Sequence, residues 1–342
     1  MSGPAAEAAR IDVAVIGLGV GEQHAMAWSR ETAVGRVWLV DLDPERAREV
    51  CSRVERSAVA GSYANLLGDP RVAAVSIASF DDDHFAQACA ALEAGKHVFV
   101  EKPLCRSLAE AERLHALWRA AAGRLHLDCN LVLRAAPLYV WLRERIADGA
   151  LGDLFAVDGD YLYGRLAKIT AGWRRDVNDY SVMQGGGIHL IDLLLRLSGE
   201  RPRSVVANGN RISTRGSGFR YDDFRAATFQ FDSGLIGRIT ANFGCVHPHQ
   251  HVLRVFGTRA TFIHDDAGAR LLRSRDPGAG AEKVGHAPLP AGKGALIADF
   301  LARALAEEGD GGETQLCFDG ICAAIAADRA ARSGAVETIE YL

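Results

Sequence analysis

Lysine is scarce in this chain of 342 residues. Of its 39 basic residues only five are lysine, at positions 96, 102, 168, 283 and 293, and the others are arginine. Codon usage in a GC-rich genome is the simplest explanation for so much arginine. Because this background does not readily explain a lysine, the positions of the five lysines are informative.

Long apolar runs and an excess of one charge are also absent. No apolar segment reaches the roughly 18–20 residues of a membrane span, and the first ten residues lack the apolar core of a signal peptide. There are 43 acidic residues against 39 basic ones, without a basic block that would bind nucleic acid or an anionic membrane. The sequence therefore predicts a cytoplasmic globular protein with no nucleic-acid or membrane partner.

Closely grouped cysteines are missing as well. The seven cysteines are widely spaced, their number is odd, and no Cys-x-x-Cys occurs. Disulfide frameworks and zinc ribbons both need tighter grouping. We expect most of these cysteines to be small buried side chains in a reducing compartment.

The first 130 residues alternate short apolar segments with amphipathic ones. Their strands are apolar without alternation, which is typical of a parallel sheet covered by helices on both faces. This pattern predicts an α/β Rossmann domain with a parallel sheet over residues 1–129. The expected strands are 11–16, 37–40, 73–78, 98–100 and 125–130, and the expected helices are 22–32, 45–54, 83–94 and 108–122.

After residue 130 the pattern changes to two-residue alternation. It predicts an α+β domain over residues 130–342 with a large mixed or antiparallel open sheet. We expect this domain to bind substrate. A broad apolar sheet face needs covering, so it should also mediate a homodimer or homotetramer. The expected strands are 154–163, 204–212, 226–231, 236–243, 252–256 and 261–263, the expected helices are 136–147, 189–197, 295–307 and 314–332, and 276–294 is expected to be a loop.

A glycine-rich turn follows the first predicted strand, in the order Gly17-Leu18-Gly19-Val20-Gly21. In a strand–turn–helix of this kind, backbone N–H groups at the helix start bind a pyrophosphate. The pattern is imperfect, because Glu22 stands where the third glycine is usual. Asp41, at the end of the second strand, would accept hydrogen bonds from a ribose 2′-hydroxyl and repel a 2′-phosphate, which favours NAD over NADP. The alternative is an ordinary turn with Asp41 capping a helix.

The segment 91–104, ALEAGKHVFVEKPL, closely resembles the signature of the Gfo/Idh/MocA oxidoreductase family. The resemblance runs nearly from end to end of the chain. It includes His24, His84, Asn130 with Arg134 and Pro137, the segment 149–152, Trp173 to Arg175, and Gly187 to Asp192.

The resemblance implies an NAD-dependent oxidoreductase with Lys102 and His189 on either side of the reacting carbon. A desolvated lysine amine can take up a hydroxyl proton, and an imidazole titrates in an accessible range. The implied cofactor contacts are Gly17, Gly19, Val20, Gly21, Asp41, Ser79, His84, Glu101, Lys102 and Trp173. The implied substrate contacts are Asn130, Arg134, Arg174, Asp179 and Asp192, and no metal is implied.

One departure from the family pattern affects the proton path. Family members usually read Asp-x-Gly-x-His, but here Gly185 stands four residues before His189. Asp179 or Tyr180, just upstream, could supply a polar group, or Lys102 and His189 act without one. The exit of the third strand also departs, with Ser79-Phe80-Asp81 where the family often has Thr-Pro-Asn.

Two further groups of residues are open to more than one interpretation. The segment 245–251, CVHPHQH, has the composition of a metal site, but it could equally line a substrate pocket or a subunit interface. Tyr161 and Tyr163 share one face of a predicted strand, where they would stack on a sugar or pack in the core.

These features predict an NAD-dependent dehydrogenase that oxidises a ring secondary hydroxyl of a sugar, amino-sugar or cyclitol to a ketone. By analogy we expect a role in antibiotic biosynthesis, such as that of an aminoglycoside. The alternatives are an NAD(P)H-dependent ketoreductase of a nucleotide-linked keto-sugar, an NAD-dependent glycoside hydrolase and a non-catalytic regulator that senses a dinucleotide.

Overall fold

The computed structural model describes residues 10–306 and 311–342. The chain forms two compact units. The first is built from the described residues of segments 1–105, 112–130 and 291–314, and the second from segments 106–111, 131–290 and 315–342. Residues 291–314 thus return to the first unit after the chain has passed through most of the second. The division into a cofactor domain and a substrate domain at residue 129 stays a prediction.

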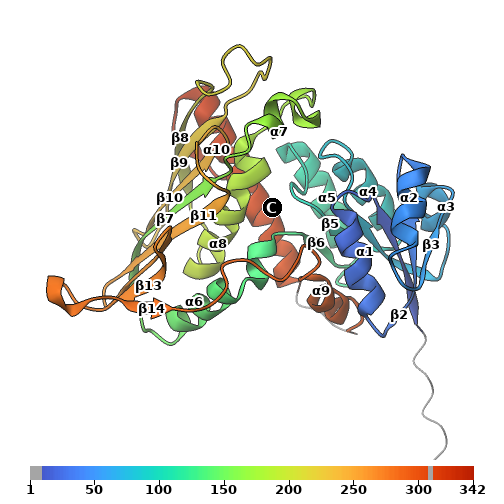
Figure 1. The fold of residues 1–342 in the computed structure, drawn as a ribbon, viewed down its shortest axis with the longest axis horizontal. Coiled ribbons are helices and arrows are strands. Elements are labelled where there is room, and N and C mark those ends of the chain that lie inside the picture. Colours follow the sequence, from blue (N-terminus) through green and yellow to red (C-terminus); the bar gives the residue numbers. More distant parts are fainter. Residues whose placement is uncertain (1–9, 307–310) are drawn as a thin grey trace, which may run out of the picture. The chain divides into compact units, whose positions relative to one another are not determined.

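The first unit contains a sheet of six parallel strands in the order β3-β2-β1-β4-β5-β6 (Figure 1). This confirms the predicted parallel α/β architecture. The strands are β1 (Ile11–Ile16), β2 (Val34–Val40), β3 (Ser57–Val59), β4 (Val72–Ile77), β5 (His97–Val100) and β6 (Leu127–Cys129). The short strand β3 and the helix α3 (Tyr63–Leu67) that follows it were not predicted.

Helices pack against this sheet and close its core. Apart from α3 they are α1 (Gly21–Arg30), α2 (Pro44–Cys51), α4 (His84–Glu93), α5 (Leu108–Ala120) and α9 (Ile297–Ala304). Phe300 of α9 lies with its ring centroid 5.4 Å from that of Phe99 in β5 and 6.0 Å from that of Trp28 in α1. All three rings are fully buried. A helix encoded near the end of the chain therefore completes the core of the first unit.

The second unit contains a mixed sheet of nine strands in the order β14-β13-β12-β11-β7-β10-β9-β8-β15. Only β7 and β10 pair in parallel, and all other neighbours are antiparallel. This confirms the predicted mixed open sheet. The strands are β7 (Leu154–Leu162), β8 (Ser204–Asn210), β9 (Phe224–Gln230), β10 (Ile236–Asn242), β11 (Gln250–Gly257), β12 (Thr261–Asp265), β13 (Gly268–Leu272), β14 (Glu282–Val284) and β15 (Glu337–Thr338).

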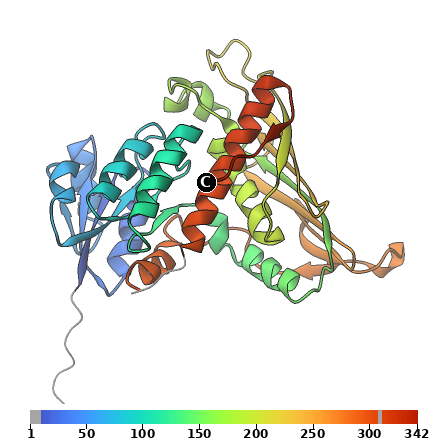
Figure 2. The same cartoon turned by 180° about the vertical axis from the view of Figure 1, so that it is seen from behind.

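Helices of the second unit cover one face of this sheet, as the two views in Figures 1 and 2 show. They are α6 (Pro137–Ala147), α8 (Ile188–Ser198) and α10 (Gly312–Ser333). The middle strands also carry an ion-pair ladder, in which Arg238 lies 3.1 Å from Asp158 and Arg254 lies 3.3 Å from Asp160. The sheet is therefore more polar at these positions than the expected broad apolar face.

The segment predicted as a loop over 276–294 is partly ordered as regular structure. It contains a 3₁₀ turn at Pro277–Ala279 and the strand β14, which extends the sheet edge by pairing with β13. Shorter elements of the second unit are 3₁₀ turns at Val132–Ala135 and Trp173–Arg175, the helix α7 (Ala167–Thr170) and a π-helical turn at Met183–Gly187. Among the described residues, no helix has the length and apolar character needed to cross a bilayer.

A histidine pair at the start of β5, of which His126 is buried and His97 half-buried, makes the stability of the first unit depend on pH. His97 Nδ1 accepts the backbone N–H of His126 at 3.2 Å, and the two rings stack with centroids 5.8 Å apart. Burial, with a smaller effect from His126, lowers the pKa of His97 to about 4 from 6.5. The unfolded chain therefore binds the His97 proton more readily than the folded one. The stabilisation is complete above pH 6.5 and is lost as the pH falls toward 4.

We expect the free energy of unfolding to fall by about 1–2 kcal/mol between pH 7.5 and pH 5 because of His97. Urea unfolding at both pH values measures it, and the His97→Gln variant should show a smaller fall. The exposed His286 provides a control, since His286→Gln should leave the pH dependence as it is. An equal fall in wild type and His97→Gln would contradict this assignment.

Candidate active site

The predicted glycine turn lies between β1 and α1 in the first unit. Gly17 has φ +79°, and a Cβ there would lie 2.6 Å from the carbonyl oxygen of Ala78, so only glycine fits. A Cβ at Gly19 would meet no atom within 4 Å, which leaves room at the start of α1. No side chain caps the first turn of α1 at Val20. The backbone N–H groups at the start of α1 are thus suited to bind a phosphate.

Asp41 is fixed beside this turn. Its carboxylate accepts the backbone N–H of Leu18 at 2.6 Å and that of Asp43 at 2.9 Å. Arg46, which donates to the carbonyl oxygen of Leu18, is paired with Glu22 at 2.6 Å. A fixed carboxylate beside the turn, with the neighbouring guanidinium already paired, fits the ribose diol of NAD.

The third-strand exit is connected to the segment that carries Lys102. The His84 ring is fully buried, with Nδ1 2.8 Å from the carbonyl oxygen of Pro103 and Nε2 3.3 Å from that of Ser79. The hydroxyl of Ser79 donates to the side-chain oxygen of Gln87 at 2.7 Å. His84 therefore positions the chain around Lys102 and Pro103, whose peptide bond is cis.

Glu101 lies in a buried polar cluster of the first unit. Its Oε1 accepts from Asn130 Nδ2 at 2.7 Å and lies 3.3 Å from His24 Nε2. His24 Nδ1 lies 3.0 Å from the hydroxyl oxygen of Ser76, and Asn130 also donates to the carbonyl oxygen of Lys293 at 2.8 Å. The amide donor of Asn130, a predicted substrate contact, is therefore used inside this unit.

The charges of this cluster keep Glu101 ionised. Burial alone would raise the pKa of the Glu101 carboxyl. The hydrogen bond and charge of His24, with the charges of Lys102 and Lys293, outweigh burial and hold this pKa well below its usual range. Lys102 itself is half-buried, and its backbone N–H lies 3.3 Å from Glu101 Oε2. No local pattern indicates that Lys293, in a loop rich in glycine and proline, would lie beside this cluster.

In the second unit, two predicted substrate contacts bind one another. Arg134 donates through Nη2 to Asp192 Oδ1 at 2.6 Å and through Nε to Oδ2 at 3.0 Å. Only 4% of the Arg134 side chain and 0% of the Asp192 side chain are exposed. This pair joins the 3₁₀ turn at Val132–Ala135 to helix α8, which carries His189.

His189 is the second residue of α8, and aromatic side chains surround its ring. The ring stacks on that of Tyr161 with centroids 6.2 Å apart, and the His251 ring meets it edge-on at 5.9 Å. His249 is 5.2 Å from the Tyr161 ring centroid. Burial, with smaller effects from Tyr163 and Tyr180, raises the pKa of Tyr161. Tyr161 thus stays a neutral phenol beside His189.

The side chains of segment 245–251, which has the composition of a metal site, do not come together around one point. His249 and His251 face Tyr161, whereas His247 Nε2 lies 3.2 Å from the carboxylate of Asp266 at the surface. Within residues 10–306 and 311–342 no group of three or more histidine, cysteine, aspartate or glutamate side chains is arranged to hold a metal ion.

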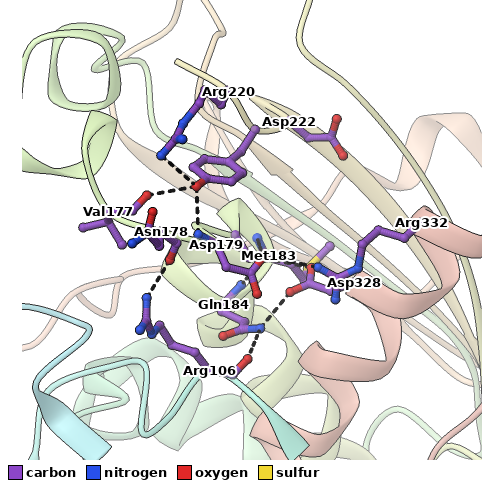
Figure 3. Close-up of polar contacts among 12 residues, drawn as sticks. Arg106, Val177, Asn178, Asp179, Met183, Gln184, Arg220, Asp222, Asp328 and Arg332 are labelled. Carbon is purple, nitrogen blue, oxygen red and sulfur yellow. Dashed lines mark hydrogen bonds and ion pairs between the residues drawn. The ribbon is translucent and has the colours of Figure 1, made fainter. Parts of the chain in front are cut away.

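The other predicted contacts of the second unit lie near its surface. The Arg174 guanidinium carbon is 4.3 Å from the ring centroid of Trp173. Asp179 has an exposed carboxylate 3.4 Å from Arg332 of α10, and its backbone N–H donates to the hydroxyl of Tyr221 (Figure 3). The predicted site residues thus divide between the units. The glycine turn, Asp41, Ser79, His84, Glu101, Lys102 and Asn130 lie in the first, and Arg134, Trp173, Arg174, Asp179, His189 and Asp192 lie in the second.

A parallel sheet with this glycine turn and fixed carboxylate, followed by a unit with a large mixed sheet, defines a class of dinucleotide-dependent oxidoreductases. Residues 11–128 match the model of an oxidoreductase family with an NAD-binding Rossmann fold, and residues 139–263 match the GFO/IDH/MocA C-terminal domain. The two matches cover most of the chain, which belongs to the Gfo/Idh/MocA oxidoreductase family. Its first unit is the NAD-binding Rossmann domain of that family.

Two of the similar proteins are named as dehydrogenases. An inositol 2-dehydrogenase of Acidothermus cellulolyticus is 35% identical over 150 residues, which is 42% of this chain and 42% of that protein. A levoglucosan dehydrogenase in complex with NADH superposes with a TM-score of 0.83 at 20% identity, covering 97% of this chain and 100% of that one. GenD2 from gentamicin A biosynthesis, in complex with NAD, gives 0.80 at 21% identity, covering 99% of each chain.

The similar sequence and the similar structures support different conclusions. The chain spans less than half the length of the inositol dehydrogenase that it matches. The two solved structures are each less than 25% identical in sequence to this chain, and they show its fold.

Proposed function

We propose that this protein is an NAD-dependent dehydrogenase that oxidises a ring secondary hydroxyl of a sugar, amino-sugar or cyclitol to a ketone. The Glu101-Lys102-Pro103 segment carries the proposal. It follows β5 at the carboxyl edge of the parallel sheet, where open α/β sheets bind ligands. The buried cluster around Glu101 and the contact from His84 to Pro103 fix its backbone, and Lys102 itself is half-buried.

The residues of each unit have separate tasks in this reaction. NAD⁺, which the glycine turn and Asp41 would hold, would supply the acceptor for the hydride of the carbinol carbon. The hydroxyl proton must leave at the same time, and we assign its acceptance to Lys102, assisted by His189. The Arg134–Asp192 pair holds the first turn of α8 and thereby the His189 ring. Glu101 is an unsuitable proton acceptor, because its carboxylate is buried and its lowered pKa makes it a weak base.

Formation of NADH tests the proposal directly. The purified protein is mixed with NAD⁺ and a panel containing myo-inositol, levoglucosan, free amino-sugars and amino-sugars within aminoglycosides, and absorbance at 340 nm is followed. We expect turnover with at least one ring polyol. Oxidation of NADH by nucleotide-linked keto-sugars, without polyol oxidation, would instead favour the ketoreductase. Tight NAD⁺ binding without turnover in either direction would favour the non-catalytic regulator.

Amino-sugars belong in the panel because the similar structure of GenD2 comes from gentamicin A biosynthesis. We therefore extend the proposal to a keto-sugar intermediate of antibiotic biosynthesis as the product. Preference for a free cyclitol such as myo-inositol over every amino-sugar would contradict this extension and leave the dehydrogenase activity in place.

The position of Asp41 predicts a preference for NAD⁺ over NADP⁺. Its carboxylate would repel a 2′-phosphate, so Asp41→Ser should raise the ratio of kcat/KM for NADP⁺ over NAD⁺ by at least about tenfold. Asp43→Asn is a matched control, because Asp43 caps α2 and does not bond to the glycine turn. Titration with NADH and NADPH measures the corresponding ratio of binding affinities without substrate. An unchanged ratio in Asp41→Ser would show that Asp41 does not contact the ribose.

A further inference from the structure

Position 185 is one of the places where the sequence departs from its family, and the structure shows what fills the space there. A Cβ on Gly185 would lie 2.5 Å from the hydroxyl oxygen of Tyr180 and 3.1 Å from its Cζ. Real Cβ atoms do not approach other atoms at 2.5 Å. The phenol hydroxyl of Tyr180 therefore occupies the volume in which a side chain at position 185 would begin.

Tyr180 belongs to the aromatic group around His189. It is 5% exposed, and its ring meets that of Phe243 edge-on at 6.3 Å. Phe243 in turn lies 5.6 Å from Tyr161, the ring on which His189 stacks. The influence of Tyr180 on Tyr161 noted above agrees with this placement. Ring contacts through Phe243 and Tyr161 thus connect Tyr180 to His189.

Asp179, the other residue that could replace the missing carboxylate, faces elsewhere. It has φ +56°, its side chain is 71% exposed, and its carboxylate lies near Arg332 (Figure 3). Its backbone N–H donates to the Tyr221 hydroxyl at 2.8 Å. The left-handed conformation at Asp179 is uncommon for a residue other than glycine. With Asp179 facing outward, Tyr180 is the polar side chain that remains.

Helix α10 contacts the turn between Tyr180 and His189 through Asp328. Asp328 accepts from the hydroxyl of Ser181 at 2.8 Å and from Gln184 Nε2 at 2.8 Å, and it also pairs with Arg225. Gln184 also reaches the carbonyl oxygen of Arg106 (Figure 3). These bonds fix the backbone between Tyr180 and Gly185, so the Tyr180 hydroxyl has a defined position before substrate binds.

We propose that Tyr180 takes the role of the absent carboxylate and hydrogen-bonds a substrate hydroxyl beside the reacting carbon. This inference rests on the proposed dehydrogenase function. A carboxylate only accepts hydrogen bonds, whereas a phenol donates one and accepts another. The site therefore binds its substrate through a neutral group, and an ordinary phenol keeps its proton up to about pH 10. The activity has no acid limb from a carboxylate at this position.

Removal of the hydroxyl alone tests the role toward substrate. We expect Tyr180→Phe to lower kcat/KM for the polyol by about 10–100-fold, with NAD⁺ binding and melting temperature unchanged. Tyr341→Phe is the control, because its half-buried hydroxyl donates to the carbonyl oxygen of Pro202 away from His189. Wild-type kcat/KM in Tyr180→Phe would overturn the proposal.

Moving the polar group to position 185 provides a rescue. Tyr180→Ala makes room at position 185, and the double variant Tyr180→Ala with Gly185→Asp restores a carboxylate in the same space. We expect the double variant to be at least several-fold more active than Tyr180→Ala and to lose activity toward acid pH, in the range where a carboxylate titrates. A double variant no more active than Tyr180→Ala would contradict the shared position.

Thermal unfolding tests the geometry without any turnover. Gly185→Ala should lower the melting temperature by several degrees in wild type and by less in the Tyr180→Phe background, because the closest contact is then removed. Equal losses in both backgrounds would overturn the placement of the hydroxyl. If wild type oxidises no polyol, the proposed function fails and the substrate role fails with it. This double-mutant cycle still decides whether Tyr180 fills the space at position 185.

Discussion

Lys102→Ala should abolish NADH formation, with a loss of about 10³-fold or more in kcat/KM, while NAD⁺ affinity changes little. The amine is the group that we assign to accept the hydroxyl proton, and unpositioned water replaces a positioned base poorly. The main chain around it should not move, because Glu101 and Pro103 are held by Asn130, His24 and His84. The loss should therefore appear in kcat.

Two further variants separate a chemical role from a loss of positive charge. Lys102→Arg keeps the charge, but its guanidinium does not release a proton near neutral pH, so it should be nearly as inactive as Lys102→Ala. Lys283→Ala, at an exposed position in β14, should be fully active. If Lys102→Ala kept a tenth of wild-type activity with an unchanged melting temperature, Lys102 would not be the proton acceptor.

Asp192→Ala should destabilise the protein by about 3–5 kcal/mol, because it leaves the Arg134 guanidinium buried without its counter-charge. The Arg134–Asp192 pair is bidentate, and both side chains are almost fully buried. Urea unfolding of wild type and variant at neutral pH measures the change. The first turn of α8 should be the region most affected.

The double variant Arg134→Met with Asp192→Ala removes both charges and should recover part of the lost stability. An exposed ion pair of the same unit provides the control. Arg273 and Glu282 lie 3.3 Å apart with about half of each side chain exposed, and Glu282→Ala should cost less than about 1 kcal/mol. A cost this small for Asp192→Ala would show that Arg134 finds another partner or reaches water.

Much of the first unit could be predicted from local sequence. Strands β1, β4 and β5 are apolar on both faces because helices cover both sides of the sheet, and Asp43 with Pro44 mark the start of α2. The return of α9 could not be predicted. Its apolar face is visible in the sequence, but nothing local says that Phe300 packs on Phe99 and Trp28, which lie some 200 and 270 positions earlier.

The candidate site was predicted as a set of residue types more than as a set of contacts. Asn130, Arg134 and Asp192 were each expected to meet substrate, and each has buried polar partners within its own unit that the sequence did not indicate. Their contact with substrate stays a prediction. Sequence alone does not show which oppositely charged side chains will pair, since the pairing depends on how α8 packs. The space at Gly185 was visible only as a missing carboxylate, because its filling depends on the conformation of Asp179 and Tyr180.

The position of α9 along the chain has a consequence for synthesis. All six strands of the first unit leave the ribosome before α9, and at 5–20 residues per second the interval between β6 and α9 lasts about 10–30 s. The rings of Trp28 and Phe99 lack the covering ring of Phe300 during that time. The second unit likewise lacks its helix α10 until the end of synthesis. The last stretch of chain, from residue 291 onward, therefore completes both halves of the protein nearly together.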